Sequence, residues 1–292
     1  MTTSAPPALV SIHGGHSGEF CQHAGDSLEA ILEAYAAQGF AWVGITEHMP
    51  PAGDRFRYPD EVAAGLDAAA LRERFAHYIV TGRRLQAAFA DRLTVFIGME
   101  TETYSGAAAF VRELVAAFAP DYLVGSVHHV ADRNFDFSPA AYALAARAVG
   151  GLDALYIRYF DLQLEMIEAL KPAVVGHFDL VRIYDPDYRA RIERPAIRSR
   201  IRRNLACIRD LGLILDFNVR ALVKGAAEPY IAAPILKAAH AMGIALVPGD
   251  DSHGVDTVGR HIPRGIRLLQ ALGVNTDWPR PVLSVRKSPR IA

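Results

Sequence analysis

The chain has 292 residues, 51% of them hydrophobic, and a formal net charge of −1. This composition is sufficient for one large hydrophobic core. The near-neutral charge argues against binding to nucleic acid or to a membrane surface. The two cysteines, Cys21 and Cys207, make no disulfide framework, which predicts a reducing, cytoplasmic location. We expect no signal peptide, because the first residues lack a basic segment followed by a long apolar run, and no run is long enough to span a bilayer.

Short apolar, β-branched runs recur along the chain. They are too hydrophobic for a sheet with one face in water, so they predict buried parallel strands. In chain order the seven runs are 8–13, 40–48, 93–102, 122–129, 173–179, 213–218 and 244–253.

Helical patterns alternate with these runs. The first, 26–39, has Asp26 or Ser27 as its N-cap candidate and Gly39 at its end. Further helices are expected at 67–90, 138–170, 190–211 and 231–242. The alternation predicts an α/β fold, and seven strand–helix units predict a closed or nearly closed barrel.

The chain contains no linker rich in Pro, Gly or Ser. We therefore expect a single domain over residues 1–292, with its core at about 10–262. The C-terminal tail, about 284–292, is expected to fray.

The ends of the predicted strands carry histidines and carboxylates, and the active sites of such barrels lie at the carboxyl ends of the strands. The residues found there are His13, His48, Glu100, His128, His177, Asn218, Asp251 and His253. One buried histidine is most often a hydrogen-bonded core residue. So many buried imidazoles and carboxylates are costly without a metal or other partners.

Strand geometry narrows the candidates. Side chains two residues apart share a face of a strand, and neighbours point to opposite faces. Glu100 and Glu102 share a face, so either fits as a ligand. His128 and His129 cannot both face the site while the strand stays regular.

The donor set also indicates which metals would bind. About nine candidate ligands are too many for one ion and suit two or three. Imidazole and carboxylate donors with few thiolates favour zinc, manganese or iron. Closely spaced metals bridged by a carboxylate are suited to phosphoester hydrolysis, because they supply hydroxide near neutral pH and neutralise the phosphoryl oxygens.

The order of the motifs HGGH, ITEH, GME, GSVHH, GHFD and GDDSH resembles the polymerase and histidinol phosphatase (PHP) family of metal-dependent phosphoesterases, from about residue 10 to 262. The resemblance implies a distorted (β/α)7 TIM-like barrel with a trinuclear metal centre. It also implies hydrolysis of a small phosphomonoester, most specifically L-histidinol phosphate in histidine biosynthesis, by attack of a metal-bridging hydroxide.

The resemblance further implies a ligand set. The first metal is expected on His13, His16, Glu100 and Asp251. The second is expected on Glu100, which bridges, together with His128 and His177. The third is expected on His23, His48 and His253. Among these residues, Glu100, Asp251 and His253 are the expected catalytic groups.

The opening motif departs from the family's usual His-x-His. Here Gly14 and Gly15 separate His13 from His16. Three residues of regular strand would place the two rings on opposite faces. The strand must therefore end at His13, and the two glycines must turn the backbone.

Other residues in these motifs have weaker assignments. Cys21 is interpreted as a small packing residue rather than a ligand or nucleophile. Arg182, Arg220 and Lys224 are candidates for binding the substrate's phosphate, because a guanidinium forms paired charge-assisted bonds to it. The alternative for each is a solvated surface cation.

Two alternatives remain open at this point. The same fold and metals would also serve another small phosphomonoester, a nucleotide, a sugar phosphate or a phosphodiester. A non-catalytic metal-binding or regulatory domain is the alternative of a different class, although the complete ligand set argues against it. The metal's identity, the exact substrate and the oligomeric state stay undetermined.

Overall fold

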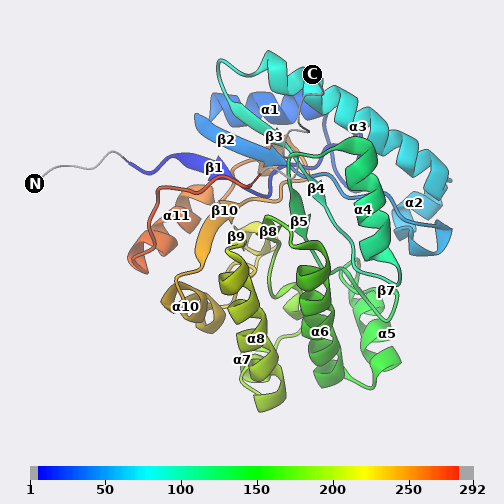
Figure 1. Ribbon diagram of the computed structural model, residues 1–292, viewed down its shortest axis with the longest axis vertical. Coiled ribbons are helices and arrows are strands. Elements are labelled where there is room, and N and C mark those ends of the chain that lie inside the picture. Colours follow the sequence, from blue (N-terminus) through cyan, green and yellow to red (C-terminus); the bar gives the residue numbers. More distant parts are fainter. Residues whose placement is uncertain (1–5, 283–292) are drawn as a thin grey trace, which may run out of the picture.

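The computed structural model describes residues 6–282, and the predicted frayed tail lies outside them. Helices surround a central group of short parallel strands (Figure 1). No helix in the described part of the chain is long and apolar enough to cross a membrane.

The strands form two parallel sheets and one small hairpin. One sheet has the order β1-β2-β3 and the other the order β10-β9-β8-β5-β4. Their bounds are β1 Leu9–Ser11, β2 Phe40–Ile45, β3 Thr94–Ile97, β4 Met99–Glu100, β5 Leu123–Gly125, β8 Val174–Val175, β9 Ile214–Asn218 and β10 Ala245–Gly249. The antiparallel hairpin pairs β6 (His129–Val130) with β7 (Arg133–Asn134).

The two sheets do not form one continuous ladder, but backbone hydrogen bonds cross both gaps between them. On one side, the Ile12 N–H donates to the carbonyl of Pro248 at 2.9 Å. On the other, the Glu100 N–H donates to the carbonyl of Glu47 at 3.0 Å. The result is the nearly closed, distorted barrel that the seven predicted strands indicated.

Eleven α-helices occur in the described part of the chain. They are α1 Leu28–Ala37, α2 Pro59–Ala63, α3 Ala68–Ala88, α4 Ala107–Phe118, α5 Pro139–Val149, α6 Leu152–Leu170, α7 Tyr188–Ile192, α8 Pro195–Leu211, α9 Arg220–Val223, α10 Ala233–Ala241 and α11 Ile262–Ala271. Ser27 caps α1, because its side chain accepts a hydrogen bond from the Ala30 N–H at 3.2 Å. Gly39, just after the helix, has a φ of +76°.

The structure corrects several element boundaries. The helix expected over 138–170 is two helices, separated at Gly150 and Gly151, whose φ values of +97° and +120° are incompatible with a continuing helix. The β6–β7 hairpin, α4 and α11 were not predicted. Most strands are also shorter than their apolar runs, so the polar residues that follow them lie on loops.

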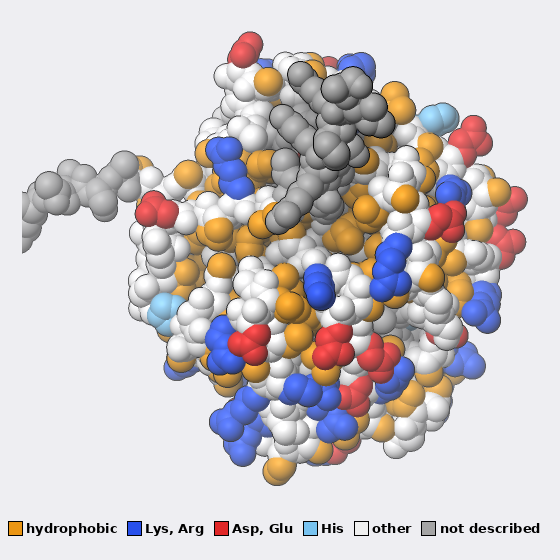
Figure 2. Space-filling view, viewed as in Figure 1, with side chains coloured by type: hydrophobic (Ala, Val, Ile, Leu, Met, Phe, Trp, Pro, Cys, Tyr) orange, Lys and Arg blue, Asp and Glu red, His pale blue; other side chains and the backbone are white. Residues whose placement is uncertain are grey.

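Buried side chains from both sheets and from most helices form one connected hydrophobic core, from Val10 to Trp278. On the face seen in Figure 2, acidic and basic side chains are interspersed. Ion pairs link several charged side chains of the described structure, for example Arg194 with Asp153 and Arg200 with Asp161.

Candidate metal centre

The predicted metal donors gather where the parallel strands end. His48, Glu100, His128, His177, Asp251 and His253 line a cavity of about 210 Å³, and His23 lies at its edge. His13 and His16 are fully buried beside it. The structure therefore brings together all nine residues of the predicted ligand set.

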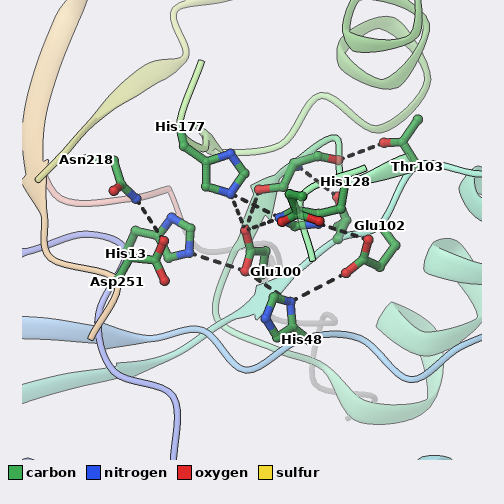
Figure 3. Close-up of polar contacts among 12 residues, drawn as sticks. His13, His48, Glu100, Glu102, Thr103, His128, His177, Asn218 and Asp251 are labelled. Carbon is green, nitrogen blue, oxygen red and sulfur yellow. Dashed lines mark hydrogen bonds and ion pairs between the residues drawn. The ribbon is translucent and has the colours of Figure 1, made fainter. Parts of the chain in front are cut away.

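Glu100 occupies the centre of this cluster (Figure 3). Its Oε1 lies 2.9 Å from His177 Nε2 and 3.4 Å from His128 Nε2, and these two nitrogens are 3.1 Å apart. Its Oε2 lies 3.4 Å from His13 Nε2 and 3.2 Å from His48 Nδ1. Each carboxylate oxygen thus faces a different group of imidazoles.

Asp216 orients His13. The His13 Nδ1–H donates to Asp216 Oδ2 at 2.8 Å, and both side chains are fully buried. This hydrogen bond leaves the Nε2 lone pair of His13 directed at the cluster. A carboxylate behind a histidine is the usual way to fix the tautomer of a metal ligand. Sequence analysis missed Asp216, although it precedes the strand-end residue Asn218 by two positions and so shares its face.

Glu47 plays a similar part for His16. Glu47 Oε1 accepts hydrogen bonds from the N–H and the hydroxyl of Ser17, at 2.8 and 2.9 Å. Its Oε2 lies 3.4 Å from His16 Nδ1. On the other side of the ring, His16 Nε2 lies 3.4 Å from Asp251 Oδ1. The residue before His48 in the ITEH motif is therefore part of the site, and sequence analysis missed it.

Glu102 lies behind His128, and its Oε1 also lies 3.5 Å from His48 Nδ1. Its Oε2 lies 2.9 Å from His128 Nδ1 and 3.2 Å from His129 Nδ1, while its Oε1 accepts from the Tyr58 hydroxyl at 2.9 Å. The expectation that His128 and His129 cannot both face the site was made for a regular strand, and of the two only His128 lines the cavity. The strand β5 ends before them, so strict alternation no longer applies.

His23, His48 and His253 form the more open side of the cluster. The ring centroid of His23 lies 5.4 Å from that of His48 and 5.2 Å from that of His253. His253 Nδ1 donates to the backbone carbonyl of Asp251 at 2.9 Å. Cys21 is buried here, and its Sγ lies within 4.8 Å of donor atoms of His16, His48 and His253.

Two close approaches explain the glycines of the HGGH motif. The Gly14 N–H donates to the carbonyl of Gly44 at 2.8 Å, and a Cβ on Gly14 would lie 2.3 Å from that oxygen. A Cβ on Gly15 would lie 2.7 Å from Ile31 Cγ2. Neither glycine has a positive φ. The motif needs glycine for space, and it lets both histidine rings enter one cluster.

The site is strongly polar although it is buried. Burial alone would lower the pKa of His16, but the neighbouring carboxylates of Asp251 and Glu47 raise the pKa to about 9. Burial alone would raise the pKa of Glu100, but the positive charges of the surrounding histidines, led by His13, hold it well below its usual value. Glu100 is therefore an ionised carboxylate at neutral pH.

Several buried donor atoms have no hydrogen-bond partner among the described residues. They are His13 Nε2, both ring nitrogens of His16, His48 Nδ1, His177 Nδ1 and Glu47 Oε2. Burying such atoms without partners is costly. Donor atoms of His13, Glu100 and His177 lie within 4.8 Å of one another, as do those of His13, His16 and Asp251. These residues fit divalent metal ions, which bind neutral imidazole and carboxylate donors.

The three predicted phosphate-binding cations differ in position. Arg220 and Lys224, at the start and just after the end of α9, line the cavity. The Nε and Nη1 atoms of Arg220 are buried without a partner in the described structure. Arg220 therefore retains hydrogen-bonding capacity for an anion.

Arg182, the third predicted phosphate-binding cation, does not line this cavity. Its Nε donates to Asp179 Oδ2 at 3.1 Å, and its Nη2 donates to the carbonyls of Glu228, at 3.1 Å, and Pro229. The guanidinium also stacks on Tyr230. Arg182 is not part of the cavity lining, and it holds the 228–230 segment in place.

Fold and site together define an α/β barrel protein with a metal centre of imidazole and carboxylate donors. Residues 14–220 match the family model of the PHP domain, which is more than half of the chain. The chain therefore belongs to the PHP domain family, as the motifs indicated.

Curated relatives align over most of the chain. "Probable histidinol-phosphatase" of Schizosaccharomyces pombe is 32% identical over 271 residues, covering 91% of this chain and 88% of that protein. "Histidinol-phosphatase" of Saccharomyces cerevisiae is 29% identical over 282 residues, covering 85% of this chain and 84% of that protein.

Solved structures share the fold. HisK of Listeria monocytogenes superposes with a TM-score of 0.78 at 24% identity, covering 87% of this chain and 99% of that one. Histidinol phosphate phosphatase (HisK) of Lactococcus lactis, complexed with zinc, L-histidinol and phosphate, gives a TM-score of 0.69 at 19% identity, covering 91% and 94%. These matches confirm the predicted α/β, TIM-like architecture.

Proposed function

We propose that this protein hydrolyses a small phosphomonoester, most specifically L-histidinol phosphate, to the free alcohol and phosphate. The observation that carries the proposal is the convergence of imidazole and carboxylate donors on both oxygens of Glu100, beside a cavity that Arg220 also lines. The yeast relatives named histidinol-phosphatases support this substrate. The zinc, L-histidinol and phosphate complex of the Lactococcus lactis enzyme supports it as well.

We further propose that the site holds two or three divalent ions, which are zinc, manganese or iron. One would be held by His13, His16, Glu100 and Asp251, a second by Glu100, His128 and His177, and a third by His23, His48 and His253. The distances around Glu100 support the first two sets most directly. When bound, such ions would lower the pKa of a water molecule and neutralise the phosphoryl oxygens.

Carboxylates and a backbone carbonyl of the chain orient the proposed metal ligands. Glu100 presents one oxygen to each of two imidazole sets, as a bridging carboxylate must. Asp216 and Glu102 hold the Nδ1 atoms of His13 and His128, so that Nε2 of each ring faces the cluster. His253 donates from Nδ1 to a backbone carbonyl, which leaves its Nε2 as a free acceptor.

Arg220 and Lys224 are proposed to bind the phosphate. The unpartnered Nε and Nη1 of Arg220 match two oxygens of a phosphoryl group. Lys224 is exposed near the same helix and adds a mobile positive charge. Both cysteines are free thiols, which suits the reducing cytoplasm expected from the sequence.

The test is phosphate release from a panel of esters by protein purified without chelator: L-histidinol phosphate, a nucleotide, a sugar phosphate and a phosphodiester. We expect the highest kcat/KM for L-histidinol phosphate, together with more than one equivalent of transition metal per chain. Removing the metal should abolish turnover, and added Zn²⁺, Mn²⁺ or Fe²⁺ should restore it.

Two variants sharpen this test. His177→Ala removes an imidazole at 2.9 Å from Glu100 and should lose both metal and turnover. His77→Ala, on the exposed side of α3, removes an imidazole outside the cluster and should behave as wild type. A protein that retains its metals but releases phosphate from no ester would overturn the proposal.

A further inference from the structure

The cavity has a second group of lining residues beyond the metal donors and the cations of α9. Asp136 and Phe137 lie on the loop between β7 and α5, and Tyr230 follows the α9 segment. None of the three is needed to hold a metal or the phosphate. Their chemistry is also different, because they offer a negative charge, an aromatic ring and a hydroxyl.

The carboxylate of Asp136 is held in place but keeps binding capacity. Its Oδ1 accepts from Asn134 Nδ2 at 2.7 Å, while its backbone carbonyl accepts from the Tyr184 hydroxyl at 3.0 Å. Within residues 6–282, Asp136 forms no ion pair and its Oδ2 accepts no hydrogen bond. A fixed carboxylate with a free oxygen in a cavity is suited to a cationic ligand group.

Tyr230 is fixed in the same way. Only 3% of its surface is exposed, and its N–H donates to the carbonyl of Asn218 at 2.9 Å. Arg182 packs against its ring, 5.1 Å from the centroid. The hydroxyl makes no hydrogen bond to any residue of the described structure, although it belongs to a cavity wall. A hydroxyl at a cavity wall that bonds no protein group is available to a ligand atom.

Phe137 completes the group at the cavity rim. It is 41% exposed, which is unusual for a large aromatic side chain, and its ring lies 6.5 Å from that of Tyr58. The Phe137 N–H donates to Asn134 Oδ1 at 3.0 Å, so the same asparagine anchors both rim residues. An exposed ring beside a carboxylate offers a surface for a flat, positively charged group.

We propose that Asp136, Phe137 and Tyr230 form a recognition subsite for the cationic end of the substrate. The substrate class would be phosphomonoesters of amino alcohols, in which an ammonium or a protonated heteroaromatic ring lies a few bonds from the phosphate. The phosphate end would meet Arg220 and the metal cluster, and the cationic end would meet Asp136. This inference rests on the proposed phosphatase function and adds the residues that determine its specificity.

The experiment compares two substrate pairs in the metal-loaded enzyme. The first pair is L-histidinol phosphate and p-nitrophenyl phosphate, which lacks a cation. The second pair is phosphoethanolamine and ethyl phosphate, which differ by the ammonium group. For Asp136→Asn we expect the kcat/KM ratio of the cationic to the uncharged substrate to fall about 10- to 100-fold in both pairs, mainly through KM. Tyr230→Phe should lower the ratio less, by about 3- to 10-fold.

Asp91→Asn is the matched control, because Asp91 is an exposed carboxylate on the loop between α3 and β3, away from the cavity. It removes the same charge and should leave both ratios unchanged. Asp136→Glu should restore part of the selectivity. Metal content and a thermal melt verify that each variant is folded.

Two results would overturn the subsite. In the first, Asp136→Asn lowers kcat/KM equally for charged and uncharged substrates, which indicates a structural role. In the second, folded Asp136→Asn and Tyr230→Phe proteins keep the wild-type ratios. Failure of the proposed function gives a different result, in which the wild type ignores L-histidinol phosphate. In that case selectivity for phosphoethanolamine that depends on Asp136 would still support the subsite, and its absence would refute it.

Discussion

Replacing Asp216 by Asn tests whether His13 is a metal ligand. Asp216 Oδ2 accepts three hydrogen bonds: from His13 Nδ1 at 2.8 Å, from Asn218 Nδ2 at 3.0 Å and from the His177 N–H at 3.3 Å. All three donors suit the Asn carbonyl oxygen equally well, so the variant should keep the geometry while losing the charge. Asp216 itself touches no proposed substrate group.

The size of the effect follows from these contacts. A hydrogen bond to a charged group contributes about 1.5–3 kcal/mol and a neutral one about 0.5–1.5 kcal/mol. The His13 bond should therefore weaken by about 1–1.5 kcal/mol, which is about tenfold in metal affinity. Substitutions of carboxylates behind ligating histidines typically cost about 10- to 100-fold. The new amide would also occupy the position of Oδ1, which has no partner among the described residues, and should lower stability by about 1–3 kcal/mol.

The assay is a competition titration of metal-free protein with a chromophoric chelator, combined with kcat/KM under saturating metal. We expect one metal to bind about 10- to 100-fold more weakly in Asp216→Asn. Asp185→Asn is the control, because Asp185 is also buried but binds Arg191 and Tyr156 instead of a metal donor. It should lose stability and keep its metal affinity. Unchanged affinity in Asp216→Asn would refute the assignment of His13 as a ligand oriented by Asp216.

The remaining predictions concern neighbouring parts of the site. Glu100→Gln should lose metal and activity almost completely. Glu102→Gln should retain metal and lose about 10- to 100-fold in kcat/KM, because the shortest contact of Glu102 to a proposed metal ligand is to the outer nitrogen of His128; metal analysis and kinetics distinguish the two variants. Arg220→Ala should raise KM and lower kcat/KM by about 10- to 100-fold in steady-state assays, since it removes a charge-assisted bond to phosphate. Arg182→Ala should instead lower the free energy of unfolding by about 3–5 kcal/mol in denaturant titrations, because it leaves the carboxylate of Asp179 buried without its charge partner. Cys21→Ser should keep its metals, and its turnover rate should stay within about tenfold of that of the wild type. A trapped phosphocysteine, or total loss of turnover with the metals retained, would refute the packing role of Cys21.

Strand ends were the most informative part of the sequence. Apolar runs marked the parallel strands, and the polar residue after each run marked the site, because the carboxyl ends of parallel strands meet at one end of a barrel. His48, His128 and His177 come from three different strands and still meet around Glu100. The alternation of strands and helices in the sequence is sufficient to predict that the side chains at the strand ends lie close together.

The supporting carboxylates were harder to find. Asp216 lies inside β9, where its charge looks like an interruption of an apolar strand, and only its hydrogen bond to His13 explains it. Glu47 lies directly before His48, so alternation places it on the opposite face of a regular strand, yet β2 has already ended at Ile45. The alternation of side chains holds only within regular strands. It could not predict these carboxylates reliably, because most of the site consists of residues in the irregular segments that follow the strands.

Arg182 is a second example of what periodicity and motifs do not show, because it was predicted to bind substrate and instead bonds distant backbone carbonyls. Its pairing with Asp179 three residues earlier is visible in the sequence, but the carbonyls of Glu228 and Pro229 are 46 and 47 residues away. A guanidinium near a histidine motif looks the same in sequence whether it binds substrate or braces a loop. Only the tertiary structure distinguishes Arg182, whose Nε and Nη2 donate to protein acceptors, from Arg220, whose buried Nε and Nη1 have no partner among the described residues.

The HGGH motif links these observations to one another. A single residue between two histidines would put both rings on one face of a continuing strand. Here β1 ends at Ser11, and the chain then runs so close to β2 and α1 that a Cβ on Gly14 would clash with Gly44 of β2 and a Cβ on Gly15 with Ile31 of α1. The backbone can then bring His13 to Asp216 and His16 to Glu47, with the Nε2 atoms of the two rings 3.4 and 3.7 Å from Oε2 of Glu100. The close packing that the two glycines allow, rather than alternation along a strand, thus places both histidine rings in the site. Each ring also has its own buried carboxylate, which fixes its orientation.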